Sequence, residues 1–120
     1  MKASVSNFNA YRAKQNKRLL ESDNLLIKRL FHLDQRAFEA GALSVANKEM
    51  LGLAMSLVLR CDDCVKYHLE QAMQAQVSEA EILEVLALAQ LVGGSIVIPH
   101  ARKAIEWWDV LHENPSISEA

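Results

Sequence analysis

The sequence has few of the residues that break helices and form tight turns. Its 120 residues include only 4 glycines and 2 prolines. Neither Asn-Gly nor Asp-Gly, the dipeptides typical of two-residue hairpins, occurs. β-Branched residues form only short clusters, and residues of high helix propensity dominate. We therefore predict an all-α fold of about five to six helices, with residues 1–120 forming a single domain.

Other absences argue against whole classes of protein. The net charge is -2 and no basic block or stripe occurs, so we expect no nucleic-acid partner. No apolar run approaches the roughly 18 residues that a membrane span needs, and we expect no membrane partner. The opening MKASVSNFNAYRAKQNK lacks the apolar segment of a secretory signal, which favours a cytoplasmic location. Cysteines are normally reduced there, so a static structural disulfide is not expected.

The hydrophobic fraction is 51%, which is high for a chain of this length. A small domain has little interior in which to bury so many apolar side chains. Apolar faces left at the surface usually mark contacts with another protein. We therefore expect the chain to associate with copies of itself.

Apolar periodicity and capping residues locate the helices. We expect an N-terminal arm or helix over about 1–20, in which 8–20 is a docking arm or partly disordered. Helices are predicted over about 23–40, 45–59, 62–75 and 79–91, followed by a last helix that starts at Ser95 or just before Pro99 and runs to about His112, and by a frayed tail over 113–120. The predicted caps are Ser22 or Asp23, Gly41 as a C′ residue, Ser44, and a capping box of Ser78 and Glu81.

Two helices carry a regular apolar pattern. In the helix after Asp23 an apolar stripe recurs every three or four residues, and in the helix after Ser44 the pattern is broader and indicates a central position. The stripes are Leu26, Leu30, Leu33 and Ala37 in the first, and Leu51, Ala54, Met55 and Val58 in the second. Gly52 lowers the propensity of the second helix by about 1 kcal/mol relative to alanine, which close approach of another helix would offset.

The segment RCDDCVKYH, residues 60–68, holds both cysteines. On a helix, Cys61, Cys64 and His68 fall within an arc of about 60°, and Cys64 and His68 are neighbours four residues apart. The free N–H groups and the dipole of a helix N-terminus stabilise a thiolate. Asp62 and Asp63 suit a helix start, but their negative charge opposes ionisation of the thiols.

Several chemistries are open to these residues. The two thiols can form a redox-active dithiol, with His68 taking a proton from Cys64. They can also be inert buried thiols, or bind zinc together with His68 and Glu49, although three ligands on one helix make an awkward tetrahedron. His100 can line a pocket, whereas His32 and His112 are expected at the surface. Of Trp107 and Trp108, one is expected to be buried and the other half-exposed.

Glu49, Cys61, Cys64 and His68 match the pattern E-x11-C-x2-C-x3-H, and GALS and KEMLGLAMSLVLRCDDCVKYHLEQAMQAQVSEAEILEVLALAQLVGGS surround them. In these features the sequence resembles the AhpD-like alkylhydroperoxidases of the carboxymuconolactone decarboxylase superfamily. The resemblance covers about residues 38–95. It implies an all-α subunit that forms homotrimers or homohexamers, with the site near a subunit contact.

The resemblance also implies a function. The expected activity is that of a thiol-dependent peroxidase or disulfide oxidoreductase that needs no cofactor and no metal. Cys64 would attack the peroxide, the more exposed Cys61 would resolve the sulfenic acid, and His68 and Glu49 would relay protons. The expected partners are a peroxide or disulfide substrate and a thiol reductant. A decarboxylase-like enzyme that uses His68 and Glu49, or a redox-sensing or zinc-binding oligomer, remains an alternative.

Overall fold

The computed structural model describes residues 2–113, with side chains from Val5 onward, and this part of the chain contains helices and no strand. The elements are α1 (Lys2–Leu20), α2 (Leu25–Ala37), α3 (Val45–Val58), α4 (Asp62–Gln74), α5 (Glu79–Gly93), the 3-10 turn η1 (Ser95–Val97) and α6 (Ile98–Glu113). The prediction of an all-α fold with five to six helices is therefore confirmed. Of the tail expected to be frayed, 114–120 lies outside the described residues. Among those described, no helix is both long and apolar enough to cross a membrane.

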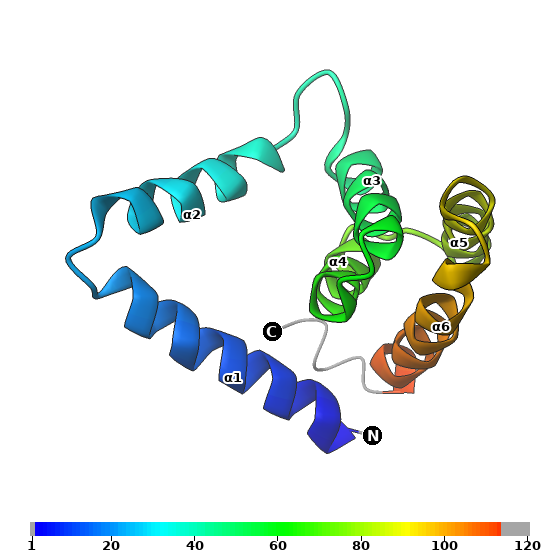
Figure 1. Cartoon of the computed structure of the whole chain (residues 1–120), viewed down its shortest axis with the longest axis horizontal. Helices are drawn as coiled ribbons and strands as arrows, with labels where there is room; N and C mark the ends of the chain where they lie inside the picture. Colours follow the sequence, from blue (N-terminus) through cyan, green and yellow to red (C-terminus); the bar gives the residue numbers. More distant parts are fainter. Residues whose placement is uncertain (1, 114–120) are drawn as a thin grey trace.

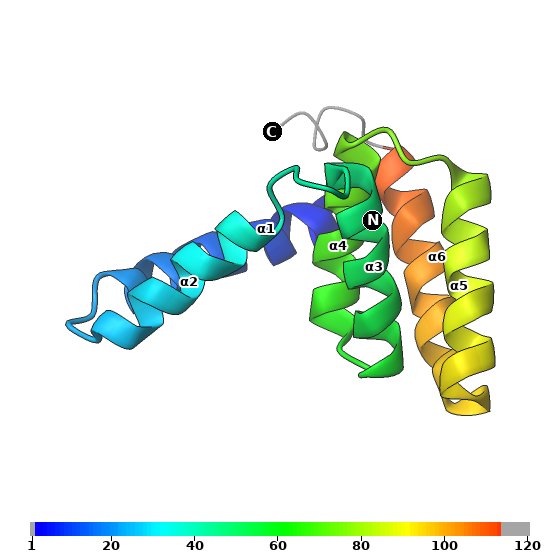
Figure 2. The ribbon, with the colours of Figure 1, turned by 90° about the horizontal axis from the view of Figure 1, so that it is seen from above.

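Helices α3 to α6 form a four-helix bundle, and α1 and α2 form an arm that projects from it (Figures 1 and 2). In the bundle α3 packs against α4 and α5, and α6 completes the ring by contacting the same two helices. The arm is held at its beginning, where Val5 is fully buried and the Phe8 ring meets Trp107 edge-on at 5.6 Å. The segment expected to be a docking arm or partly disordered is thus part of a regular helix, α1.

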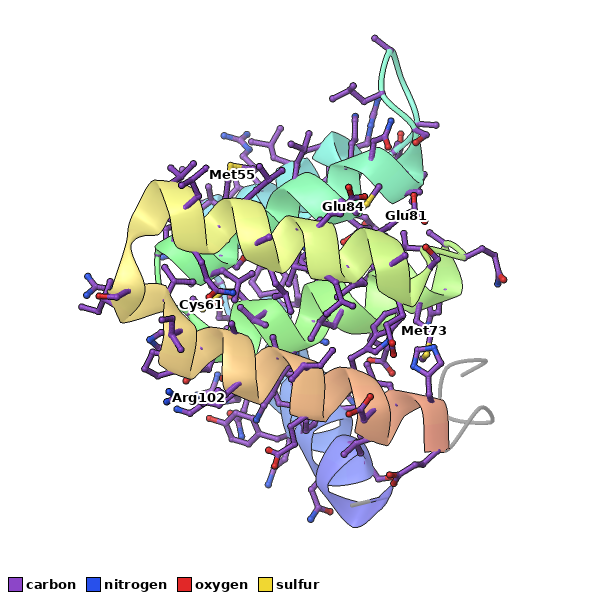
Figure 3. All side chains as sticks on the ribbon, turned by 90° about the vertical axis from the view of Figure 1, so that its right-hand side faces the viewer. Met55, Cys61, Met73, Glu81, Glu84 and Arg102 are labelled. Carbon is purple, nitrogen blue, oxygen red and sulfur yellow. A yellow bond between two sulfur atoms is a disulfide. The ribbon has the colours of Figure 1, made fainter. Side chains whose placement is uncertain are left out.

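The face that α3 turns toward the core differs from the predicted one. The apolar stripe expected there is largely exposed: Met55 is 59% exposed and lies at the outer edge of the bundle (Figure 3), and Leu51 and Val58 are exposed as well. The buried face instead contains Glu49, Gly52, Leu53, Ser56 and Leu57. Apolar residues surround most of this helix, so periodicity alone does not select the face, and packing against α4 and α5 does.

Both tryptophans of α6 are buried, at 8% exposure for Trp107 and 2% for Trp108, so the prediction of one half-exposed ring is wrong. Neighbouring residues on a helix point in directions about 100° apart and can both be covered only if the helix is packed on two sides. Helix α6 meets this condition because the bundle covers one side and α1, through Phe8, covers another.

The helix starts follow the predicted chemistry at two of three places. Ser44 caps α3 by accepting the Asn47 N–H, and Ser78 and Glu81 form the capping box of α5. The backbone N–H of Ser78 donates to the Glu81 carboxylate and lowers the pKa of that group. At α2 the predicted caps are wrong. Asn24 caps the helix, Ser22 bonds back to α1, and the helix ends at Ala37, before Gly41.

The turn between α3 and α4 is a Schellman motif. Arg60 has a left-handed backbone with φ 61°, and its N–H donates to the Leu57 carbonyl. The Cys61 N–H donates to the Ser56 carbonyl at 3.0 Å. These two bonds satisfy carbonyls that the end of a helix leaves free. Gln76, with φ 66°, occupies the same position after α4.

Replacing Arg60 by glycine should stabilise the protein, because a left-handed backbone is strained for a residue with a Cβ. We expect Arg60→Gly to raise the free energy of unfolding by about 0.5–1 kcal/mol, and Gln76→Gly to do the same. Urea unfolding would measure both changes. A loss of stability in both variants would contradict the assignment of these turns.

Candidate functional site

Glu49 and His68 form a buried pair between α3 and α4. Their side chains are 5% and 13% exposed, and Glu49 Oε1 lies 2.8 Å from His68 Nδ1. The two residues are 19 positions apart in the chain, one on each helix of the α3–α4 hairpin, and the turn at Cys61 brings them together. Two residues that the resemblance assigned to one proton relay therefore touch directly.

The pairing determines how the imidazole can act. A carboxylate accepts hydrogen bonds and does not donate them, so His68 Nδ1 carries the hydrogen that lies between the two groups. In a neutral imidazole the other nitrogen, Nε2, is then free to accept a proton. Nε2 has no hydrogen-bond partner among the described residues. The pair therefore has the arrangement of a general base held in position by a carboxylate.

Gly52 makes room for the His68 ring. A Cβ atom built at Gly52 would lie 2.8 Å from His68 Cε1 and 3.0 Å from each ring nitrogen. The expected close approach at this glycine is confirmed, and it is the imidazole of α4 that uses the space. Phe38 and Tyr67 also contact the ring, at centroid distances of 5.2 and 5.3 Å. The orientation of His68 is thus restricted on several sides.

Cys61 and Cys64 are joined by a disulfide, with their Cα atoms 5.2 Å apart. The structure therefore holds the oxidised state of the pair, one of the two states of a redox-active dithiol. Cys61 is the N-cap of α4, and its Sγ accepts the backbone N–H of Cys64 at 3.2 Å. A disulfide that closes so short a loop removes less entropy from the unfolded chain than one that closes a long loop. The bond is thus better suited to redox chemistry than to stabilising the fold.

The relative exposure of the two cysteines is the reverse of the expected one. Cys64 is exposed, whereas Cys61 is only half-exposed. The reason is the turn, because the backbone of Cys61 is bonded to the end of α3 while Cys64 lies one helical turn further on. An exposed Cys64 also argues against inert, buried thiols. Cys64, the cysteine nearer His68 in the sequence, is therefore the one that a substrate can reach more easily.

Cys64 and His68 line one open cleft of about 690 Å³ between α4 and the arm. The cleft is lined by Arg12, Asn16 and Leu20 of α1, by Lys28, Phe31, His32, Asp34 and Gln35 of α2, and by Asp63, Cys64, Tyr67 and His68 of α4. The contribution of the arm was not predicted, because no local signal in the sequence shows where α1 and α2 lie relative to α4. His32, expected as a plain surface residue, is exposed but faces this cleft.

Arg12 is the most notable addition from the arm. Its guanidinium carbon lies 4.4 Å from the centroid of the Tyr67 ring, which in turn contacts His68 edge-on. Burial raises the pKa of Tyr67, the Glu49 carboxylate adds to this effect, and Arg12 opposes it. Tyr67 therefore stays protonated at neutral pH and acts in the cleft as an aromatic wall with a hydroxyl group.

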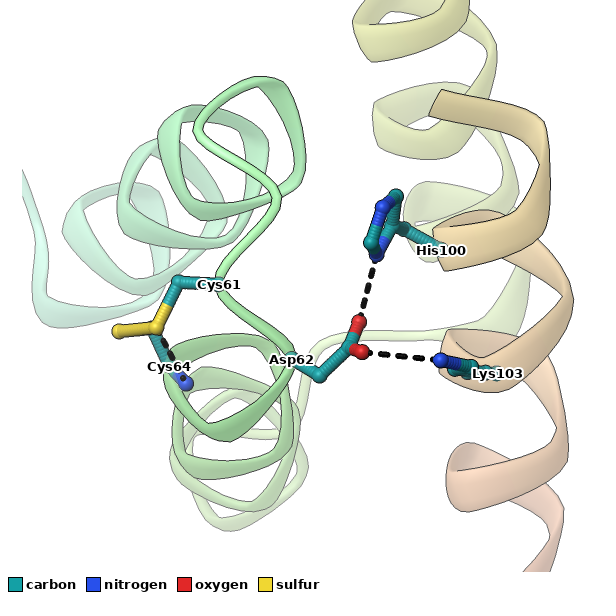
Figure 4. A network of polar contacts seen from close by, with 5 residues as sticks. All are labelled: Cys61, Asp62, Cys64, His100 and Lys103. Carbon is teal, nitrogen blue, oxygen red and sulfur yellow. Dashed lines mark hydrogen bonds and ion pairs between the residues drawn. A yellow bond between two sulfur atoms is a disulfide. The ribbon is translucent and has the colours of Figure 1, made fainter. Parts of the chain in front are cut away.

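The two aspartates between the cysteines have different surroundings. Asp62 points away from the sulfur atoms toward α6, where it contacts His100 and Lys103 (Figure 4). Asp63 is exposed and faces the cleft, and its side chain has no hydrogen bond or ion pair with any described residue. The two carboxylates that the sequence places beside the thiols thus differ in their contacts with the rest of the fold. His100 binds Asp62 instead of lining the cleft.

No three His, Cys, Asp or Glu side chains in the described part of the chain are grouped so that they could hold a metal ion. The chemistry available at the site comes from the disulfide, the Glu49–His68 pair and the polar side chains of the cleft.

Comparison with known proteins identifies relatives of this chain. The sequence pattern of the carboxymuconolactone decarboxylase family matches residues 25–107. An uncharacterised protein from Cupriavidus necator is 34% identical over 76 residues, which make up 63% of this chain and 67% of that protein.

Solved structures show the same fold. Two crystal structures of a Thermotoga maritima protein of this family, for which involvement in an antioxidative response has been suggested, each superimpose with a TM-score of 0.88. They are 42% and 44% identical, and the matches cover 95% and 92% of this chain and 97% and 96% of theirs. An apo protein of the family from Legionella pneumophila superimposes with a TM-score of 0.81, and the match covers 88% of this chain and 95% of the Legionella chain. At 24% identity this likeness shows the fold alone.

Substituting Gly52 should disturb the Glu49–His68 pair without touching a sulfur atom. The new methyl group of Gly52→Ala would overlap the imidazole, so we expect a loss of about 1–3 kcal/mol in the free energy of unfolding. A shift of the His68 ring resonances in NMR spectra should accompany it. Gly41→Ala is the control, because its Cβ would meet only Lys48 Nζ at 3.8 Å and should change stability by less than about 0.5 kcal/mol. Equal effects at the two glycines would contradict the assigned role of Gly52.

Proposed function

The chain belongs to the carboxymuconolactone decarboxylase family, and we propose that it is a thiol-dependent oxidoreductase of that family that reduces hydroperoxides through Cys61 and Cys64. A disulfide substrate is the alternative oxidant for the same dithiol. The observation that carries the proposal is the presence in one cleft of an exposed Cys64 and of a His68 paired with Glu49. The family relative from Thermotoga maritima, linked by suggestion to an antioxidative response, supports it.

The proposed cycle begins with the reduced pair. The Cys64 thiolate attacks one oxygen of the hydroperoxide, the O–O bond breaks, and the leaving alkoxide takes a proton to become an alcohol. Cys64 is now a sulfenic acid. The Cys61 thiolate attacks its sulfur, hydroxide leaves and is protonated to water, and the disulfide forms. Two electrons and two protons from an external thiol reductant restore the dithiol.

The Glu49–His68 pair fits the proton transfers that this cycle needs. Nε2 of His68 can take the proton of the Cys64 thiol, directly or through a water molecule, and can return it to the leaving oxygen. Glu49 is a positioning residue, because it holds Nδ1 and stabilises the imidazolium that forms. The N-terminus of α4 stabilises negative charge on the sulfur atoms.

Variants of the four residues test the proposal. Cys64→Ser should abolish the consumption of an organic hydroperoxide such as cumene hydroperoxide in the presence of dithiothreitol. Without dithiothreitol, Cys61→Ser should consume one equivalent and then stop with a sulfenic acid that dimedone traps. His68→Gln and Glu49→Gln should each lower the rate of the first step about a hundredfold, which is typical for the loss of a general base.

His112→Gln is the control for these variants, since His112 bonds to the Trp108 carbonyl away from the cleft and should leave the rate unchanged. Full peroxide consumption by Cys64→Ser would contradict the proposed mechanism. Activity on a carboxylactone that survives alkylation of both cysteines would favour a decarboxylase-like enzyme instead.

We further propose that the chain works as a homotrimer or homohexamer. The apolar stripe of α2 supports this, because Leu26, Leu30 and Leu33 are 68%, 64% and 62% exposed, and no residue of α2 is buried. Burying one of these leucine side chains fully in a contact between subunits would stabilise the assembly by about 1.5–3 kcal/mol.

Leu30→Glu should therefore dissociate the assembly, which sedimentation velocity would detect as a fall in mass to that of one chain. Lys14→Glu, on the exposed surface of α1, introduces the same side chain elsewhere and should leave the mass unchanged. A wild-type protein that sediments as a monomer at micromolar concentration would contradict the proposal.

A further inference from the structure

A cluster of charged and polar side chains lies behind the disulfide, on the side away from the cleft. Asp62 follows the N-cap residue Cys61 directly, and its two carboxylate oxygens are held by different residues of α6. Oδ1 lies 2.7 Å from His100 Nδ1, and Oδ2 lies 3.0 Å from Lys103 Nζ (Figure 4). These partners are 38 and 41 residues away in the chain. The cluster therefore ties the first turn of α4 to the first turns of α6.

The cluster is arranged to cancel the charge of Asp62. Lys103 supplies a full positive charge, and His100 donates a hydrogen bond to the carboxylate. The hydrogen bond from His100 is the main cause that lowers the pKa of Asp62, and Lys103 lowers it further against the effect of burial. Asp62 is thus a stable anion, with its charge compensated on the side of α6.

Asp63, the other aspartate of the motif, provides the contrast. It is exposed and has no partner among the described residues, so its charge acts on the neighbouring thiols with only solvent to screen it. A negative charge beside a thiol disfavours the thiolate, and a compensated charge does so much less. Of the two acidic residues in the motif, only one therefore opposes ionisation of the dithiol at full strength.

We propose that His100 and Lys103 are tuning residues for the Cys61–Cys64 couple, which raise its reduction potential by compensating Asp62 and holding it away from the sulfur atoms. The inference rests on the dithiol cycle proposed above. A disulfide becomes more oxidising when its reduced form is stabilised, and the reduced form here carries the thiolate. Neither residue touches a sulfur atom or the substrate cleft, so both act through Asp62.

The measurement is the equilibrium between the protein and glutathione. Two glutathione thiols reduce the protein disulfide to the dithiol, and they leave as one molecule of glutathione disulfide. Alkylation followed by mass spectrometry counts the reduced and oxidised protein at each glutathione ratio. At pH 9 an ordinary cysteine is mostly ionised while an ordinary lysine is still charged, so the equilibrium constant reports the stability of the thiolate.

His100→Leu should move the equilibrium about five- to tenfold toward the disulfide, and tenfold corresponds to about 30 mV. Lys103→Met should move it about two- to threefold in the same direction, because its ion pair lies near the surface and is screened by solvent. His100→Asn retains a donor close to the position of Nδ1 and should restore most of the wild-type value. Lys103→Met, at an exposed position, keeps the inference testable if His100→Leu does not fold.

The two aspartates serve as matched backgrounds. In Asp62→Asn, the effects of His100→Leu and Lys103→Met should both fall below about twofold, because the charge on which they act is gone. In Asp63→Asn, both effects should persist. The inference would be overturned if both α6 variants had the same equilibrium constant as the wild-type protein. It would also be overturned if the variants shifted the constant by the same factor in the Asp62→Asn background.

This experiment does not depend on turnover. A protein whose equilibrium responds as described but which consumes no hydroperoxide contradicts only the proposed function. A protein that consumes hydroperoxide through Cys64 but whose equilibrium does not respond to the α6 variants contradicts only the tuning role of His100 and Lys103.

Discussion

The site depends on how the chain turns between α3 and α4. The backbone N–H of Cys61 closes the end of α3 on the Ser56 carbonyl, and the sulfur of the same residue accepts the Cys64 N–H at the start of α4. One residue therefore ends one helix and begins the next. This double role leaves the hairpin little freedom, so residues on facing sides of α3 and α4 are held at defined separations.

Two consequences of this turn meet at His68. The first is that the helices pack closely enough for the imidazole to occupy the space above Gly52. The second is that the ring reaches Glu49, one turn before that glycine on the same face of α3. A buried carboxylate without a partner is costly, and a buried imidazole without one is also unfavourable. Each group thus satisfies the other, and the pair both stabilises the hairpin and orients a base toward the cleft.

The structure contains two histidine–carboxylate pairs that involve α4 and that have different surroundings. The Glu49–His68 pair is enclosed between α3 and α4, and His68 faces the cleft that Cys64 also lines. The Asp62–His100 pair lies outside the cleft, against α6, and the more exposed Lys103 contacts the same carboxylate. This division suits one pair to proton transfer and the other to setting the charge around the sulfur atoms. Asp62 and Asp63 are adjacent in the sequence, but only Asp62 takes part in such a pair, and Asp63 faces the cleft.

Much of this arrangement was predictable because it depends on local chemistry. Helix propensity, the capping box at Ser78 and the scarcity of turn residues indicate the helices. The helical period brings Cys64 and His68 to one face of α4, and the resemblance to a known family adds Glu49. The errors occur where local signals are weak or ambiguous. Asn24 competes with two other residues as a cap of α2, and the apolar circumference of α3 does not identify its buried face.

The sequence by itself determined the helices and the common face of Cys64 and His68, because both follow from interactions between residues a few positions apart. The tertiary structure decided which groups surround that face. Contacts across 19 residues joined His68 to Glu49, and contacts across 38 and 41 residues joined Asp62 to His100 and Lys103. The arm brought Arg12 over Tyr67. Such contacts depend on how whole helices pack, and no spacing within a single helix encodes them.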